Sequence, residues 1–375
     1  MGKKCGRCST RYCGAECQKQ HWEQGGHDQL CKPIKKAGGA EQYNANEKYT
    51  EAVAVAVEAC AEDTKGQTCY ICTQALHRRT KEGLVRGCAC HTTEGFVHVS
   101  CLAEQAKILL DEAEENNMEE AEADERWNRW GTCSLCEQQY HGVVRCALGW
   151  AAWKTYVGRP ETDMARCCAM TELGNGLFAA KHYEDASSVQ EAQVSMNLRL
   201  GVPVETILVA QTSLAITYGT LGRTEEAVNM CRDVYSGHLK IHGEEDRQTV
   251  LAANNYANTL IDLNCLKEAK ALMHKTIPVA RRVLGDTDRL TLKMRALYAQ
   301  ALYKDSGSTL DDHHEAVTTL EDVERAARRV LGGAHPLVSV IQRDLEGARA
   351  ALSAREGDDV SSVCEGVAAM TPGGA

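Results

Sequence analysis

Four close pairs of cysteine and histidine residues in the middle of the chain constrain its fold more than any other feature. In chain order these residues are Cys69, Cys72, Cys88, Cys90, His98, Cys101, Cys133 and Cys136. A structural zinc ion takes four thiolate or imidazole ligands, and a gap of two residues lets both thiolates of one turn reach the same ion. Each pair therefore supplies half of a site, and the four pairs predict two zinc ions rather than a set of buried free thiols.

Cross-braced zinc modules share their ions between alternate pairs. In this arrangement the first and third pairs hold one ion, with the ligands Cys69, Cys72, His98 and Cys101. The second and fourth pairs hold the other ion, with the ligands Cys88, Cys90, Cys133 and Cys136. Because protein atoms fill all four positions around each ion, we expect both ions to be structural rather than catalytic.

The spacing of the pairs resembles that of the RING-CH (RING-variant) zinc fingers. The second pair is separated by one residue, seven residues then precede the histidine, and the string Gly95-Phe96-Val97 leads into it. The resemblance implies a finger over residues 63–140 that docks a ubiquitin-conjugating enzyme on a shallow apolar groove formed by Ile71 and Leu135. The alternative family with the same ligand order is the PHD finger, which only Trp130 favours.

A second cysteine-rich segment occupies residues 1–31. Its candidate ligands are Cys5, Cys8, Cys13, Cys17, His27 and Cys31. Together with Tyr12 and Trp22, this pattern resembles the second half of a MYND-type finger, a family that binds short, often proline-containing peptides. The resemblance implies one zinc ion on Cys5, Cys8, His27 and Cys31. A complete finger of this family has an earlier cysteine pair that binds a second ion together with Cys13 and Cys17. Either a truncated gene model or a degenerate module would explain why this pair is missing here.

From about residue 163 the chain repeats itself. An alanine that follows a short polar string recurs at intervals of about 40–47 residues, and a glycine recurs with a similar period. The positions are Ala186, Ala227, Ala269 and Ala316 for alanine, and Gly201, Gly243, Gly285 and Gly332 for glycine. Such a period predicts an α-solenoid, in which each helix pair buries its apolar face by stacking on the next. The pattern resembles tetratricopeptide (TPR) repeats of the kinesin-light-chain type and implies an array over residues 163–355.

The first helix of each TPR pair lines a concave groove for an extended peptide or a partner helix. Counting from the alanines, the side chains expected to point into this groove are those of Asn175, Thr212, Asn254, Asn258 and Gln300. Asn254 and Asn258 are four residues apart and share one helix face. A carboxamide both donates to and accepts from a peptide backbone, so we expect Asn175, Asn254 and Asn258 to bind a protein or peptide substrate. The alternative is that they are ordinary exposed polar residues.

The remaining segments are expected to connect these modules. Residues 32–62 should form a helical connector, with a helix over 41–62 after a break at Pro33 to Gly39. An acidic helix over 102–127 would be an insertion in the central finger. Residues 141–162 would be a second connector, and the glycine-rich tail, 356–375, would be disordered.

Charge and hydropathy limit the partners. The formal charge is −10, which argues against general nucleic-acid binding. No apolar run approaches the length of a bilayer span, so we expect no membrane partner. Cysteines in metal-site spacing are typical of a reducing compartment, so we expect a soluble cytoplasmic or nuclear protein.

These features give a mostly α fold: a TPR α-solenoid preceded by small zinc-stabilised modules. Three functions are compatible with it. The first is a ubiquitin ligase without a covalent intermediate, in which the RING-CH finger recruits the conjugating enzyme and the TPR array recruits the substrate. The second is a non-enzymatic adaptor, and the third is a histone-tail reader built on a PHD-like finger. We also expect removal of zinc to unfold residues 63–140 and to leave the helical repeats folded.

Overall fold

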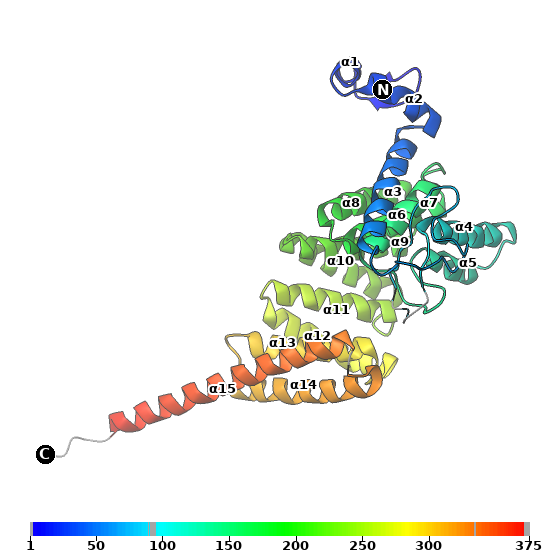
Figure 1. The fold of residues 1–375 in the computed structure, drawn as a ribbon. Helices are drawn as coiled ribbons and strands as arrows, with labels where there is room; N and C mark the ends of the chain where they lie inside the picture. The colour runs from blue at the N-terminus through cyan, green and yellow to red at the C-terminus, as the bar shows by residue number, and fades with distance from the viewer. Residues whose placement is uncertain (1–2, 89, 91–94, 334, 371–375) are drawn as a thin grey trace. The chain divides into compact units, whose positions relative to one another are not determined.

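The computed structural model describes residues 3–88, 90, 95–333 and 335–370 (Figure 1). Within this range the chain is mostly helical, as the sequence predicts, and it divides into two compact units at residues 202 and 203. The expected TPR array begins at residue 163, so its first helix pair belongs to the first unit together with the cysteine-rich segments.

The first unit begins with a two-stranded antiparallel sheet, in which β1 (Lys3–Lys4) pairs with β2 (Arg11–Tyr12). Its helices are α1 (Ala15–Glu23), α2 (His27–Ala37), α3 (Ala40–Ala59), α4 (Val99–Glu115), α5 (Glu120–Trp127), the 3-10 turn η1 (Asn128–Trp130), α6 (Gly142–Tyr156), α7 (Met164–Ala179) and α8 (Tyr183–Leu200). The second unit contains α9 (Val204–Thr220), α10 (Thr224–His242), α11 (Arg247–Asp262), α12 (Leu266–Leu284), α13 (Arg289–Lys304), α14 (Leu310–Leu331) and α15 (Pro336–Met370).

Two helix boundaries differ from the sequence-based expectation. Pro33 lies inside α2, and the break follows at Gly38 and Gly39, which both have positive φ. Only glycine adopts such angles without strain, so the glycines and not the proline end this helix. The acidic helix expected over 102–127 is two helices, α4 and α5, because Asn117 adopts φ +48° between them. Asparagine is one of the few residues that enter this region readily.

One continuous hydrophobic core joins the central finger to helices on both sides of it in sequence. It contains Ala56 of α3, Val97 of the finger, Trp130, Leu148 of α6 and Ala169 of α7, all buried. Residues 141–162, expected to be a connector, therefore contain a core helix, α6, that packs against α3, α4 and α7. Trp130, which favoured the PHD interpretation, is buried edge-on to the ring of Tyr156.

Helices α6 and α7 approach closely at two glycines. A Cβ atom on Gly149 would lie 2.7 Å from the carbonyl oxygen of Glu172, and one on Gly176 would lie 2.8 Å from that of Arg145. Beside this contact the side chains of Arg145 and Glu172 form an ion pair with an N–O distance of 2.5 Å, largely shielded from solvent. The absence of a side chain at each glycine therefore allows the helices to bury this pair.

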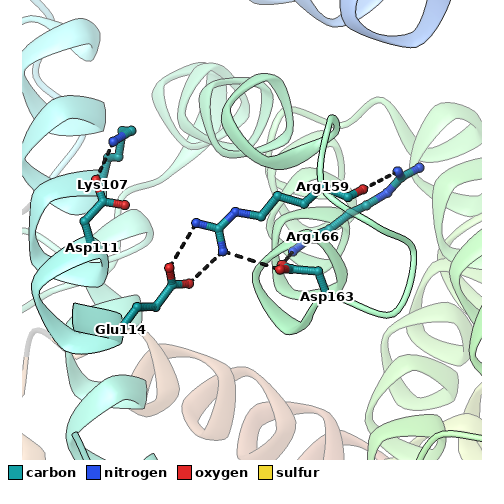
Figure 2. Close-up of polar contacts among 6 residues, drawn as sticks. All are labelled: Lys107, Asp111, Glu114, Arg159, Asp163 and Arg166. Carbon is teal, nitrogen blue, oxygen red and sulfur yellow. Dashed lines mark hydrogen bonds and ion pairs between the residues drawn. The ribbon is translucent and has the colours of Figure 1, made fainter. Parts of the chain in front are cut away.

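A polar network joins the finger helix α4 to the segment before α7 (Figure 2). Arg159 donates to both carboxylate oxygens of Glu114, at 2.6 and 3.1 Å, and its Nη1 lies 3.5 Å from Asp163. Asp163 in turn caps α7 by accepting from the backbone N–H of Arg166 at 3.1 Å. A bidentate arginine–carboxylate pair fixes orientation as well as distance, so it holds α4 against the start of α7.

The second unit stacks helix pairs as the repeat pattern predicts. Successive helices from α9 to α15 pack against one another, and the helices α9, α11, α13 and α15 are also neighbours. The repeat alanines Ala227, Ala269 and Ala316 are fully buried, and so is Ala186 in α8 of the first unit. The junction glycines Gly201, Gly243, Gly285 and Gly332 all have positive φ. The repeats are thus built on a small residue at the helix contact and, at each junction, a positive φ that favours glycine.

The tail expected to be disordered over 356–375 is instead helical as far as Met370, in α15; the last five residues lie outside the described range. In the described part of the chain, every helix is too short or too polar to cross a bilayer.

Candidate metal centres and partner groove

The first pair and the third pair of the central segment meet at one point. The ligand atoms of Cys69, Cys72, His98 and Cys101 all lie within 4.8 Å of one another. Nδ1 of His98 is 3.4 Å from the sulfur of Cys72 and 3.6 Å from that of Cys101. A tetrahedron with Zn–S of about 2.3 Å and Zn–N of about 2.0 Å has S–N edges of about 3.5 Å. The spacing therefore fits a zinc ion.

The second and fourth pairs form a separate cluster of Cys88, Cys90, Cys133 and Cys136 within the same limit. The sulfurs of Cys90 and Cys133 are 3.7 Å apart, close to the S–S edge of about 3.8 Å that tetrahedral zinc requires. Gly95 lies against this cluster with φ +89°, and a Cβ atom there would be 2.9 Å from Cβ of Cys90. The alternate pairing expected from the sequence is the one that brings these side chains together.

The N-terminal segment forms a third cluster, of Cys5, Cys8, His27 and Cys31. The sulfurs of Cys5 and Cys31 are 3.8 Å apart, and Nε2 of His27 is 3.4 Å from the sulfur of Cys8. All four side chains are buried. Their spacing fits zinc as well as that of the central clusters does.

Cys13 and Cys17, the other two predicted ligands of this segment, join each other instead. Their sulfurs are 2.50 Å apart in a disulfide. Among the described residues, no third cysteine, histidine or carboxylate group joins them in a metal-binding cluster. Paired in this way, neither sulfur offers a thiolate, so in this structure Cys13 and Cys17 are not metal ligands, contrary to their place among the predicted ligands.

The same backbone turn holds the three cysteine pairs that have a two-residue gap: Cys5 and Cys8, Cys69 and Cys72, and Cys133 and Cys136. At Cys69 the backbone N–H donates to the carbonyl of Gln74 at 3.0 Å, and the N–H of Thr73 donates back to the carbonyl of Cys69 at 2.8 Å. Equivalent bonds occur at Cys5 and at Cys133. The residue after the second cysteine, Ser9, Thr73 or Glu137, has positive φ in each case. The turn also points backbone N–H groups at sulfur, as from Ile71 to Cys69 at 3.4 Å.

A fourth copy of this turn carries no cysteine. The N–H of His77 donates to the carbonyl of Glu82 at 3.0 Å, the N–H of Lys81 donates to the carbonyl of His77 at 2.9 Å, and Lys81 has φ +61°. In place of thiols, Nδ1 of His77 lies 2.8 Å from the hydroxyl of Thr80.

Groups outside the ligand set orient the ligands. Nε2 of His98 lies 3.4 Å from the carbonyl oxygen of Ala75, which selects the tautomer with a free lone pair on Nδ1. Burial lowers the pKa of His98, which favours the neutral ring that a metal needs. Glu82 accepts from the backbone N–H of Ser100 at 2.7 Å and so caps α4. No sequence signal identifies Ala75 or Glu82, because both act through contacts made only on folding.

Burial also acts on the thiols. It raises the pKa of Cys90 and of Cys101, because a thiolate is poorly solvated inside the cluster. A divalent cation reverses this preference by pairing with the thiolates. The clusters therefore combine a geometry that fits zinc with a charge that needs a cation.

The two predicted contact residues of the central finger are exposed at the tips of its turns, Ile71 at 38% and Leu135 at 47%. Ile71 also lines a cleft of about 610 Å³ beside α4, whereas Leu135 lies outside it.

The second unit contains a groove of about 610 Å³ on the neighbouring helices α9, α11, α13 and α15. Asn254, Asn258 and Gln300 line it. Asn254 is only 7% exposed, and its Oδ1 lacks a hydrogen-bond partner among the described residues. Thr212 lines a separate pocket of about 250 Å³. Asn175 is half-buried on α7, in the first unit.

Comparisons with known families identify two of the modules. The family model of the MYND finger matches residues 2–31, and the family model of the tetratricopeptide repeat matches residues 207–248 and 249–289. The chain therefore carries an N-terminal MYND finger, binds zinc and contains TPR repeats that receive protein partners, as predicted. A comparison with curated proteins finds no match.

Three solved structures are similar to this chain at low sequence identity. Two crystal structures of nearly identical TPR-like repeats, from a Podosopora anserina protein described as a kinesin light chain, are 19% and 20% identical with TM-scores of 0.43 and 0.42. Both cover 62% of this chain, and the matches span 98% and 97% of theirs. BtubC (BKLC) from P. vanneervenii is 13% identical over 74% of this chain and 95% of its own, with a TM-score of 0.44.

Proposed function

We propose that this protein is a zinc-stabilised adaptor, whose TPR groove captures an extended segment of one partner while its zinc fingers contact another. The observation that carries the proposal is the unpaired acceptor of Asn254 in the groove of the second unit. A buried acceptor without a donor costs about 1–3 kcal/mol, and the backbone N–H of a bound peptide would remove that cost.

Apolar side chains complete the groove. Ile216 of α9 and Val340 of α15 both line it and are both largely exposed. A peptide laid across the helices would bury its own apolar side chains against them while Asn254, Asn258 and Gln300 bond its backbone. The main chain of the peptide would then provide affinity, and its apolar side chains would provide selectivity.

The experiment is a peptide array probed with the wild-type protein and with two variants. Asn254→Ala removes the buried acceptor, and Asn229→Ala removes an exposed asparagine of α10 that lies outside the groove. We expect Asn254→Ala to lose signal on the peptides that the wild type binds, and Asn229→Ala to retain it. Equal signals for all three proteins would refute the assignment of the groove.

We further propose that the central finger, residues 63–140, is a RING-CH finger and that Ile71 and Leu135 dock a ubiquitin-conjugating enzyme. The support is the alternate sharing of ligand pairs between two closed clusters, together with the exposure of both residues. Such a ligase needs no nucleophile of its own, because it holds the charged conjugating enzyme near a substrate and raises the local concentration of the two.

This finer proposal is tested with purified protein, ubiquitin, activating enzyme and a panel of conjugating enzymes. We expect ubiquitin chains with the wild type and few with Ile71→Ala or Leu135→Ala. The matched control is Leu76→Ala, which removes an apolar side chain of the same finger that is 59% exposed and lies outside the proposed contact. If no conjugating enzyme supports chains, the finger is a binding module and the adaptor remains.

A further inference from the structure

The cleft beside the first zinc cluster is lined by turns of the finger and by three helices of the first unit, α3 (through Tyr49), α4 and α6. Ile71 and Arg79 come from the finger, Lys107 and Ile108 from α4, and Lys154 from α6. Its volume of about 610 Å³ lies within the range of about 300–1,000 Å³ typical of ligand sites.

The charged lining of this cleft is mostly positive. Arg79, Lys107 and Lys154 face a single carboxylate, that of Glu104. Lys107 is paired with Asp111, its neighbour one turn along α4 (Figure 2). Arg79 makes no ion pair with any described residue and is exposed. An anion entering the cleft would therefore meet at least one cation, Arg79, that no described carboxylate neutralises.

Lys154 is the most constrained of these cations. Its ammonium lies 4.1 Å from the centre of the Tyr49 ring, and burial lowers its pKa. The carboxylate of Glu82 acts on it from nearby, but that group is already bonded to the N–H and hydroxyl of Ser100, at 2.7 and 2.8 Å. A half-buried cation held mainly by a ring face gains from a desolvated carboxylate.

Apolar groups border the same cations. Ile71 and Ile108 both line the cleft and are both exposed, at 38% and 47%. Exposed apolar side chains beside a charged lining are typical of protein contacts rather than of sites for small ions. The occupant should therefore offer carboxylates and at least one apolar side chain together.

From this arrangement we infer that the cleft between the finger, α4 and α6 binds an acidic segment of a partner protein, with a carboxylate at Lys154 and Arg79 and an apolar side chain at Ile71 and Ile108. The inference goes beyond the adaptor proposed above, because it names a second partner site outside the TPR groove and its chemistry. Ile71 is shared with the conjugating-enzyme contact proposed above, whereas Lys154 and Arg79 belong to the acidic site alone, so variants of these two cations test it separately.

The test uses fluorescence polarisation with the zinc-loaded full chain and a short labelled peptide rich in Asp and Glu around one Leu. Two control peptides replace the acids by their amides, or the Leu by Ser. Lys154→Met removes the charge but keeps the apolar stem of the side chain, and Arg79→Gln removes the charge at the rim. Arg78→Gln is the matched control, since Arg78 is an exposed neighbour outside the cleft.

We expect Lys154→Met and Arg79→Gln each to weaken binding of the acidic peptide about fivefold or more, the effect of losing one partly shielded charge pair. Arg78→Gln should stay within about twofold, and both control peptides should bind more weakly. Equal weakening by Arg78→Gln, or equal binding of the amide peptide, would overturn the inference. So would single-stranded RNA binding more tightly through the same two residues, which would make the cleft a polyanion site. Zinc content and circular dichroism establish that each variant is folded.

Discussion

The fit of the ligand pairs around an ion depends on a few neighbouring groups that are not ligands themselves. The sequence predicts the ligands because their spacing reflects local turns. It does not predict Gly95 beside Cys90 or the carbonyl of Ala75 behind His98, because those contacts join parts of the finger that meet only after folding.

Gly95→Ala should damage the cluster of Cys88, Cys90, Cys133 and Cys136. The added Cβ would lie 2.9 Å from Cβ of Cys90, closer than normal contact allows. In addition, alanine is strained at the positive φ of this position, so the backbone of the turn must shift. We expect a loss of stability of about 1–2 kcal/mol and weaker retention of one zinc ion per chain in competition with a chelator. Gly158→Ala is the control, because its added Cβ would have only Gln42 near it, at 3.8 Å. Zinc retention by Gly95→Ala equal to that of the wild type would contradict the expectation.

The buried pair of Arg145 and Glu172 should make stability depend on pH. Burial raises the pKa of Glu172 above its ordinary value of 4.5, and the charge of Arg145 offsets this only in part. The folded state therefore holds this proton more tightly, so the stabilising contribution is complete below pH 4.5 and is lost as pH rises through the folded pKa.

Glu172→Gln should remove this dependence but lose about 3–5 kcal/mol by leaving the buried Arg145 guanidinium unpaired, and Arg145→Met should lose a similar amount by leaving the carboxylate unpaired. Chemical denaturation at a series of pH values measures both. The difference between variants at each pH cancels the separate effect of thiol protonation. The same slope in the wild type and in Glu172→Gln would show that another group is responsible.

At the scale of helices, the repeat period predicts the stacked pairs and the buried alanines because both follow from local spacing. Element boundaries are less predictable. Pro33 is tolerated inside α2, and α15 continues through a segment whose composition predicts disorder. In both places the end of the helix depends on the backbone angles of individual residues, which the glycine or proline content of the segment does not predict.

The turn inside each early helix pair offers an element-scale prediction. Gly222 and Asn264 adopt φ +75° and +60° there, and Lys181 occupies the corresponding position with φ +66°. A lysine in this conformation is strained by about 1 kcal/mol, so Lys181→Gly should raise stability by about that amount. Lys181→Ala keeps the strain and should change stability little, which separates the backbone effect from loss of the side chain. Thermal denaturation that ranks the two variants alike would rule out this explanation.

For the whole molecule, the shared core changes what zinc removal should do. The expectation that only residues 63–140 depend on zinc does not allow for Trp130, Leu148 and Ala169, which bury the finger together with α6 and α7. Sequence reasoning places the finger and the repeats in separate modules because it cannot see which helices cover a finger.

Chelation should therefore unfold much of the first unit and leave the second unit, residues 203–370, folded. Hydrogen exchange should show loss of protection in α3, α6 and α7 together with the finger, and retained protection from α9 to α14. Adding zinc back should reverse the change, with three ions per chain if all three clusters bind. Loss of protection confined to residues 63–140 would restore the simpler expectation.

The turn at His77 has a consequence for how the protein acquires its metal. It adopts the shape of the cysteine turns with a histidine and a threonine in place of thiols, so its short-range hydrogen bonds are sufficient to set that shape. By the same logic the cysteine turns can be in place before any ion arrives. Zinc would then bind to preformed cysteine turns. The rate of zinc binding would be limited by how often two turns come together, rather than by how quickly each turn forms.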